Sequence, residues 1–203
     1  MLKQFGSHTL HVSKLQAKME GILSISSSVS DNPFCKKNAT IPGSVCSKCY
    51  ATRGIKRFKS LKSLLEKNTE VLSKVRFTKE DIPFFNDTIF RFQSHGEINT
   101  TLEVENYMTI CDANPHCTFT LWTKRPNIVN KVLSKREKPA NMILIHSSLM
   151  VDREEKLPEN FDKVFTVFSS EDAGINCGAK SCITCRKCYN LEDKTVFVRE
   201  KLK

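Results

Sequence analysis

Four cysteines near the end of the sequence have the spacing of ligands to a single metal centre. They follow a C-x4-C-x2-C-x2-C pattern and are Cys177, Cys182, Cys185 and Cys188. A segment this short can wrap one zinc ion or one 4Fe–4S cluster, and either centre accepts four thiolates. Zinc ribbons usually divide their cysteines between two separated C-x2-C pairs, so the continuous run favours an iron–sulfur cluster, with zinc as the alternative.

Three further cysteines, Cys35, Cys46 and Cys49, form a second group with C-x10-C-x2-C spacing. Three thiolates leave one coordination position of a cluster or metal open, and an open position is where a substrate or cofactor can bind. Alternatively, a fourth ligand comes from elsewhere; the candidates are His8, His11, Cys111 and Cys117. Cys111 and Cys117 are more simply core residues, which leaves seven metal ligands among the nine cysteines.

Two polar segments that follow apolar runs could supply further site residues. His95 and Glu97, in the segment Ser94-His95-Gly96-Glu97, are candidates for a catalytic acid–base pair, because alternate residues of an extended segment point the same way. The alternative is a glycine turn with solvated flanks. Lys124 and Arg125 follow the apolar run 118–123 and could bind a phosphate or carboxylate of a substrate.

The formal net charge of +10 is confined to the first 80 residues. These residues hold fifteen Lys and Arg against five Asp and Glu, whereas the rest of the chain holds seventeen of each. A one-sided basic surface attracts polyanions, and its densest stretch includes Arg53 and Arg57. We therefore expect this region to bind a nucleic acid or nucleotide; the alternative is a solvated basic helix face.

Apolar periodicity predicts strands and helices in alternation. The expected strands are 21–28, 88–93, 118–123, 142–146, 164–168 and 195–198; the expected helices are 54–75, one capped by Thr100 and Glu103, and one that begins at Pro126. Repeated strand–helix–strand units imply parallel pairing with right-handed crossovers. The fold class is therefore α/β: a single domain, 1–203, built as an incomplete βα barrel or a doubly wound, mostly parallel sheet of about six strands.

Functional groups of both architectures lie on loops after the carboxyl ends of strands. The cysteine loop 31–52, the segment 94–97 and the late cysteine segment 176–189 all follow predicted strands. The sequence has no run of eighteen apolar residues and no apolar leader at its start. It therefore predicts a cytoplasmic protein with reduced thiols and no membrane partner.

Four motifs resemble those of the phage-encoded gene product 88 family. They are Cys46-Ser-Lys-Cys49-Tyr50-Ala51, Phe90-Arg-Phe-Gln-Ser-His-Gly-Glu97, Leu121-Trp-Thr-Lys-Arg125 and the cysteine run 177–188. The sequence departs from the family at Gln93, usually His, and at Glu97, more commonly Asp. The resemblance spans about residues 20–190 and implies a protein of phage or prophage origin in the cytoplasm of an infected or lysogenic host. It leaves the reaction open.

The layout also resembles the partial barrels of radical S-adenosylmethionine (radical SAM) enzymes. These enzymes carry three cysteines after the first barrel strand and a Gly-Gly-Glu element after the second. The resemblance implies that Cys35, Cys46 and Cys49 hold a 4Fe–4S cluster and that Ser94, Gly96 and Glu97 contact S-adenosylmethionine. The cysteine spacing differs, because radical SAM enzymes usually have C-x3-C-x2-C.

The sequence thus leads to an iron–sulfur protein with one or two clusters, acting as a radical SAM-like enzyme on a polyanionic substrate. The alternative is a zinc- or cluster-stabilised nucleic-acid-binding accessory protein without catalysis. A transglycosylase-like barrel ranks last, because no clear pair of catalytic aspartates is present.

Overall fold

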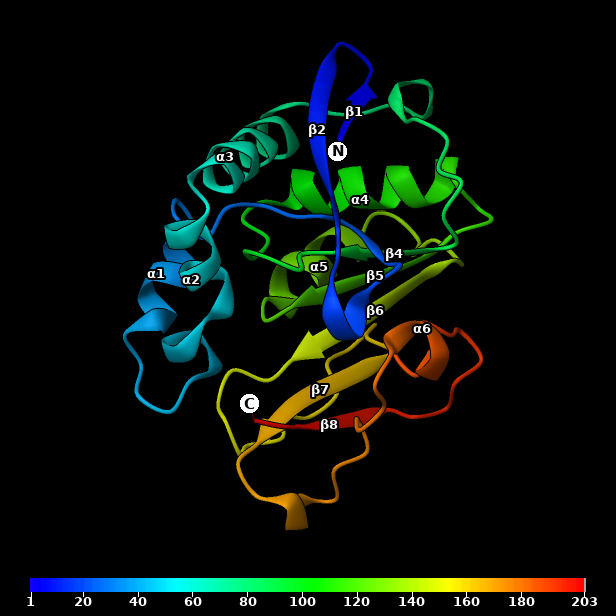
Figure 1. Cartoon of the computed structure of the whole chain (residues 1–203). Helices are drawn as coiled ribbons and strands as arrows, with labels where there is room; N and C mark the ends of the chain where they lie inside the picture. The colour runs from blue at the N-terminus through cyan, green and yellow to red at the C-terminus, as the bar shows by residue number, and fades with distance from the viewer. Residues whose placement is uncertain (203) are drawn as a thin grey trace.

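Eight strands form one sheet whose spatial order is their order along the chain (Figure 1). The computed structural model describes residues 1–202. The first two strands pair antiparallel with their neighbours, and the strands from β3 onward are parallel. The strands are β1 (Leu2–Phe5), β2 (His8–Lys14), β3 (Leu23–Ile25), β4 (Ile89–Phe92), β5 (Thr118–Thr123), β6 (Met142–Ser147), β7 (Lys163–Phe168) and β8 (Phe197–Lys201).

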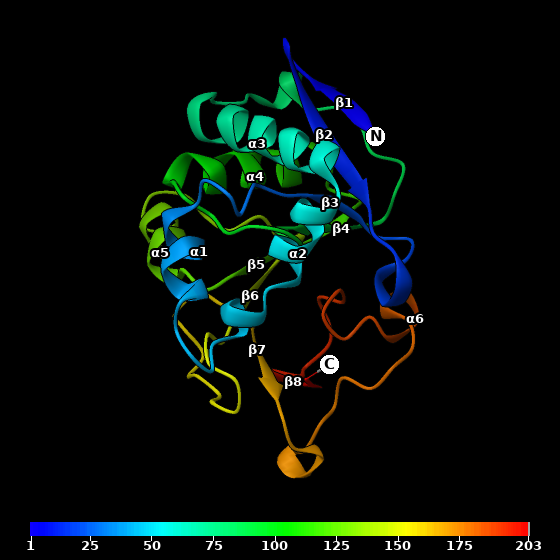
Figure 2. The same ribbon diagram turned by 60° about the vertical axis from the view of Figure 1, so that its left-hand side comes forward.

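The helices lie in the connections between strands. They are α1 (Pro33–Ala39), α2 (Tyr50–Arg57), α3 (Lys59–Lys74), α4 (Thr101–Ala113), α5 (Pro126–Leu133) and the short α6 (Cys182–Cys185). Figure 1 shows α1 and α2 at the carboxyl ends of the parallel strands and α6 near their amino ends, and Figure 2 also separates α6 from α1. A doubly wound sheet reverses its strand order at a switch point. The consecutive order here has no reversal, which argues against that alternative.

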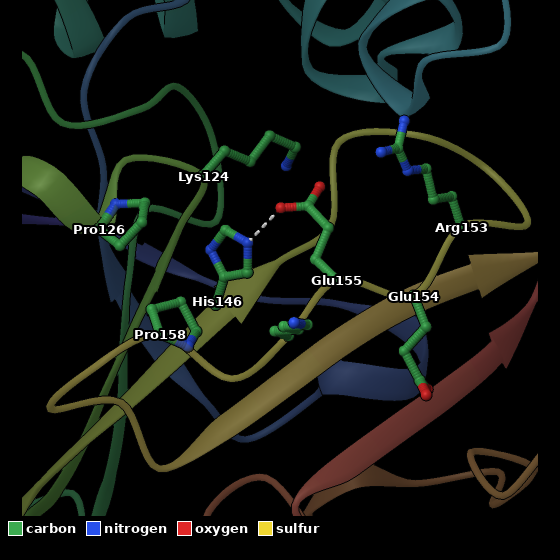
Figure 3. Close-up of a pocket in the computed structure, with 8 residues that line it drawn as sticks. Lys124, Pro126, His146, Arg153, Glu154, Glu155 and Pro158 are labelled. Carbon is green, nitrogen blue, oxygen red and sulfur yellow. Dashed lines mark hydrogen bonds and ion pairs between the residues drawn. The ribbon is translucent and has the colours of Figure 1, made fainter.

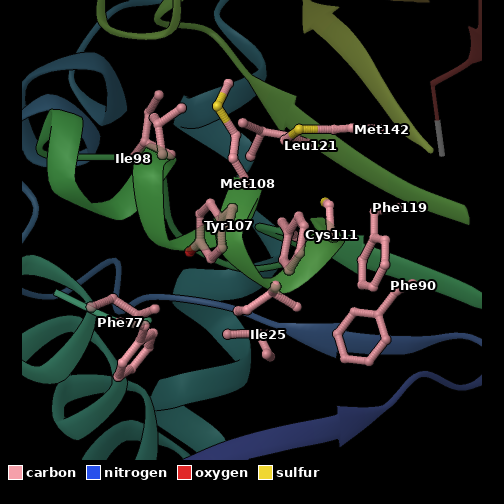
Figure 4. Packing of buried hydrophobic residues seen from close by; sticks show 14 of the residues in the cluster. Ile25, Phe77, Phe90, Ile98, Tyr107, Met108, Cys111, Phe119, Leu121 and Met142 are labelled. Atoms are coloured by element: carbon pink, nitrogen blue, oxygen red, sulfur yellow. The ribbon is translucent and has the colours of Figure 1, made fainter. Parts of the chain in front are cut away.

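The main core lies between the sheet and helices α3, α4 and α5 (Figure 4). Alternate strand residues point to one face, so Phe90, Phe92 and Phe119 stack together there. Tyr107 of α4 stacks on Phe92 with 4.3 Å between ring centroids. Cys111 is fully buried in this cluster, as the sequence predicted for a core cysteine.

A second apolar cluster covers the opposite face of the sheet. It combines strand residues such as Trp122 and Ile145 with Cys188 and Tyr189 of the late cysteine segment. The C-terminal cysteine segment therefore packs on the sheet itself.

Most predicted elements are confirmed, and the differences have local causes. The strand expected at 21–28 is β3, which stops at Ile25, because the buried serines that follow bond to other segments. The helix expected at 54–75 is two helices, broken at Phe58 by an extended backbone (φ −118°, ψ 89°). The last strand lies two to three residues later than predicted, and the β1–β2 hairpin and α1 were missed.

Within residues 1–202, no helix is both long and apolar enough to cross a membrane.

Candidate functional site

The three N-terminal cysteines lie on short helical turns beside the end of β4. Asn32 caps α1, accepting a bond from the Cys35 backbone N–H, and its side-chain amide donates to the carbonyl of Glu97 at 2.6 Å. Cys46 lies in the 3-10 turn Val45–Lys48, and Cys49 directly precedes α2. These hydrogen bonds attach the cysteine segment to the segment 94–97.

The three thiols share one electrostatic neighbourhood with Glu97 and Lys124. Burial, with added repulsion from Glu97, Cys46 and Cys49, raises the pKa of Cys35 to about 12. Burial also raises the pKa of Cys46, although the Lys124 ammonium opposes the rise. Metal ligation requires thiolates, so a metal that binds these residues must displace their protons and release them to solvent.

Glu97 is almost fully buried and holds the ends of β4 and β5 together. Its Oε1 accepts from the Thr123 hydroxyl and from the Ile98 N–H, and its Oε2 accepts from the Lys124 N–H at 2.8 Å. The preceding residue must be small, because a Cβ on Gly96 (φ +72°) would lie 2.4 Å from the carbonyl oxygen of Ser27. The carboxylate therefore has a fixed position near the thiols.

His95 lies between Tyr50 and Ser94. Its ring meets that of Tyr50 edge-on at 5.6 Å, and its Nδ1 is 3.2 Å from the Ser94 hydroxyl. Burial, helped by the charge of Arg91 and by His11, lowers the pKa of His95 to about 4. The imidazole is therefore neutral at neutral pH and can accept a proton or a hydrogen bond. His95 and Glu97 share the segment, but no hydrogen bond joins their side chains within residues 1–202.

The four predicted substrate-binding cations divide into two pairs. Lys124 lies beside the thiols and donates to the Ser147 hydroxyl at 3.0 Å. Arg125 donates to the carbonyl of Ile98 at 2.9 Å and lies over the Phe34 ring, so its guanidinium is partly occupied. Arg53 and Arg57 are exposed on α2, outside this site.

Three of the four C-terminal cysteines form a separate group. Cys177, Cys182 and Cys188 influence one another electrostatically, and burial raises the pKa of Cys188 to about 12. Lys18 donates to the Cys177 sulfur at 3.1 Å and to Glu200 at 2.9 Å. Cys185 is exposed at the end of α6. Figure 1 places α1 and α2 at the carboxyl ends of the strands and α6 near their amino ends, so the two cysteine groups lie apart.

Arg91, in the middle of β4, is a half-buried cation between these groups, and its Nε is fully buried. Its guanidinium lies 4.1 Å from the Trp122 ring centroid and 3.2 Å from the Met19 sulfur. Burial disfavours its charge, yet Tyr189, Tyr50 and Cys188 raise the pKa of Arg91 overall. Its Nε has no hydrogen-bond partner, and no carboxylate pairs with Arg91 in the described part of the chain. The sequence places this arginine between two apolar residues, Phe90 and Phe92, but Arg91 was not among the predicted site residues.

No set of three or more His, Cys, Asp or Glu side chains in residues 1–202 is placed to hold one metal ion. Metal binding by the seven cysteines therefore stays a prediction. The donor chemistry suits a cluster, because each thiolate of a 4Fe–4S cluster binds a different iron atom.

The family model described as Gene product 88 matches residues 2–200. The chain belongs to the gene product 88 family. The match extends beyond the four motifs, into the β1–β2 hairpin and β8, so it covers both cysteine groups of this gene product 88 protein. No curated protein and no solved structure matches the chain.

Proposed function

We propose that this gene product 88 protein is an iron–sulfur protein with radical SAM-like chemistry and a nucleotide or nucleic-acid substrate. The observation that carries the proposal is the gathering of three thiols beside a buried glutamate, after the carboxyl ends of consecutive parallel strands. Parallel strands in chain order are the arrangement of a βα barrel, so we interpret the sheet as an incomplete βα barrel with the N-terminal cysteines at its catalytic end.

Cys35, Cys46 and Cys49 are the ligands we assign to a cluster with one open iron. When bound, such a cluster supplies the electron that cleaves S-adenosylmethionine. Oε1 of Glu97 already accepts two bonds, whereas Oε2 accepts one and retains a free lone-pair site. Glu97 can therefore accept a bond from a cationic amine through Oε2. Ser94 and Gly96 set the backbone path that brings Glu97 there, and neutral His95 is suited to accept a hydrogen bond.

The C-terminal group is a candidate second centre, and Arg91 supports that assignment. Arg91 is a half-buried charge with no carboxylate partner in the described part of the chain, and partial removal from water is unfavourable for a charge. A centre ligated by Cys177, Cys182 and Cys188 as thiolates would carry negative charge beside Arg91 and offset that cost. Zinc remains the alternative metal here, because zinc too is bound by cysteine thiolates.

Anaerobic purification tests the proposal. We expect brown protein with iron and sulfide in stoichiometric amounts, and less iron in Cys46→Ala. Cys117→Ala, which removes a thiol outside both groups, is the matched control and should keep its iron. On reduction with S-adenosylmethionine present, we expect 5′-deoxyadenosine or methionine. Colourless protein with stoichiometric zinc would refute the iron–sulfur assignment. An intact, reducible cluster that yields neither product would refute the radical SAM assignment.

A noncatalytic nucleic-acid-binding role is the second candidate, and the surface of α2 favours it. Ala51 and Ile55 point inward, which leaves Arg53, Lys56 and Arg57 exposed together with the half-exposed Phe58 ring. Cations and exposed aromatic rings together bind single-stranded nucleic acid. Salt-dependent oligonucleotide binding that is lost in Arg53→Glu/Arg57→Glu, without cleavage of S-adenosylmethionine, would favour this role.

A further inference from the structure

A pocket of about 550 Å³ lies beside the N-terminal cysteine segment, at the carboxyl ends of β5 and β6 (Figure 3). Lys124 follows β5, His146 belongs to β6, and the loop after β6 completes the wall. That loop is joined to the cysteine segment by backbone bonds from Val45 to Leu149 (2.9 Å) and from Val151 to Gly43 (3.0 Å). Lys124 therefore faces both the pocket and the thiols.

The carboxylates of the pocket are already bound to protein groups. Glu155 accepts from the Leu149 N–H at 2.9 Å and pairs with His146 Nε2 at 2.8 Å. Glu154 holds the guanidinium of Arg199 with two bonds, at 2.7 and 3.0 Å. Arg199 therefore neutralises the charge of Glu154, whereas Glu155 keeps its negative charge unless His146 is protonated.

The cations of the pocket are not neutralised in this way. The Lys124 ammonium bonds only to the neutral Ser147 hydroxyl, among groups in residues 1–202. Arg153 and Lys156 are exposed at the rim, and neither forms an ion pair with a described residue. Three cations therefore surround a pocket in which Glu155 is, among the described residues, the one carboxylate without a bound cation, and Arg153 lies in its field. The excess of positive charge attracts an anion.

Two further observations point to a ligand at the floor of the pocket. His146 is only 4% exposed, its Nε2 is fixed on Glu155, and its buried Nδ1 has no hydrogen-bond partner. Helix α5 begins at Pro126 in the pocket wall, and no side chain caps it. Figure 3 shows Pro126 on the side of the His146 ring away from Glu155, whereas the Lys124 side chain extends above the ring toward Glu155. Uncapped helix N-termini bind anionic oxygens, phosphate above all.

We propose that this pocket binds a phosphate group of the nucleotide or nucleic-acid substrate. Lys124 and Arg153 contact the phosphate oxygens, and the N-terminus of α5 faces them. Glu155 accepts from His146 Nε2–H and so orients the ring, whose Nδ1 donates to the same phosphate when the imidazole is protonated. This phosphate site would bind the substrate of the proposed function, and its role in a reaction rests on that proposed function. Phosphate binding itself needs neither cluster nor S-adenosylmethionine, so it can be measured separately.

Calorimetric titration tests this site on the full chain. The probes are deoxyadenosine monophosphate, a short single-stranded DNA and deoxyadenosine, which lacks the phosphate. We expect binding of at least one phosphate-bearing probe, none of deoxyadenosine, and affinity that falls with added salt. Arg153→Ala should weaken binding about tenfold, the range of a lost charge-assisted hydrogen bond. Lys131→Ala, an exposed lysine on α5 outside the pocket, should leave affinity unchanged.

The outcomes distinguish nucleotide phosphate from nucleic-acid phosphate, and they test the phosphate site independently of the proposed function. Binding of the monophosphate assigns the site to nucleotides, and binding of the oligonucleotide alone assigns it to nucleic acid. No binding of either probe, equal affinity for deoxyadenosine, or unchanged affinity in Arg153→Ala would overturn the site. His146→Asn, checked for folding by circular dichroism, should also weaken binding. If the protein binds phosphate but contains no iron and does not cleave S-adenosylmethionine, the proposed function is refuted and the phosphate site is still supported.

Discussion

His95 is a neutral histidine whose surroundings oppose protonation. Burial and the nearby Arg91 lower its pKa from 6.5 to about 4. Below pH 6.5 the unfolded chain therefore binds a proton that the folded chain does not, and stability falls as the pH drops toward 4. We expect this one group to remove about 2–3 kcal/mol of unfolding free energy by pH 4. In His95→Gln the unfolding free energy should fall less steeply between pH 7 and 4, as measured by urea unfolding.

A matched change separates this effect from general acid unfolding. His8→Gln alters a histidine at the start of β2, away from the cysteine segment. It should leave the pH dependence as in the parent protein. If His95→Gln loses stability on acidification as steeply as the parent, burial of His95 does not control its protonation.

Burial should also control the reactivity of the Cys35 thiol, because it disfavours the charged form. Alkylation requires the thiolate, and burial with nearby negative groups raises the pKa of Cys35 to about 12. Cys185 is exposed at the end of α6. In reduced, metal-free protein at pH 8 we expect iodoacetamide to label Cys185 at least ten times faster than Cys35, measured by peptide mass spectrometry. Equal rates would mean that Cys35 is solvated.

At the scale of elements, the glycines of two connections should respond in opposite ways. A Cβ at Gly96 would meet the Ser27 carbonyl at 2.4 Å, and its positive φ adds strain; Gly54, inside α2, has nothing within 4 Å. Gly96→Ala should therefore cost more than about 2 kcal/mol, whereas Gly54→Ala should gain about 0.5–1 kcal/mol. Urea midpoints measure both changes. A tolerated Gly96→Ala would show that the turn can move away from Ser27.

The elements that could be predicted are those whose beginning or end is determined by residues within the element itself. The capping box of Thr100 and Glu103 and the start of α5 at Pro126 were predicted because both signals are local, and both are confirmed. The break at Phe58 was not predicted, because α2 and α3 each continue the same apolar periodicity across it. The break turns α2 so that Ala51 and Ile55 pack on Leu65.

At the scale of the whole molecule, the grouping of the cysteines could be predicted but their relative placement could not. Spacing alone divided seven thiols into two groups. Their positions at opposite ends of the strands depend on the irregular path between β7 and β8, whose sequence shows little apolar periodicity. Arg91 and the His146–Glu155 pair were also hidden, because their partners come from distant segments.

The fluorescence of Trp122 can report how the C-terminal cysteine segment packs on the sheet. Trp122 is the single tryptophan of the chain, and it shares a buried cluster with Cys188 and Tyr189. Loosening the segment should therefore expose its ring to water. Cys188→Ala should shift the fluorescence maximum to longer wavelength and cost about 1–2 kcal/mol, or about 2–8 °C in Tm for a chain of this size. Cys46→Ala changes a thiol of the other group, so its emission maximum should match the parent. Equal shifts in both variants would mean that the two cysteine groups are coupled through the sheet.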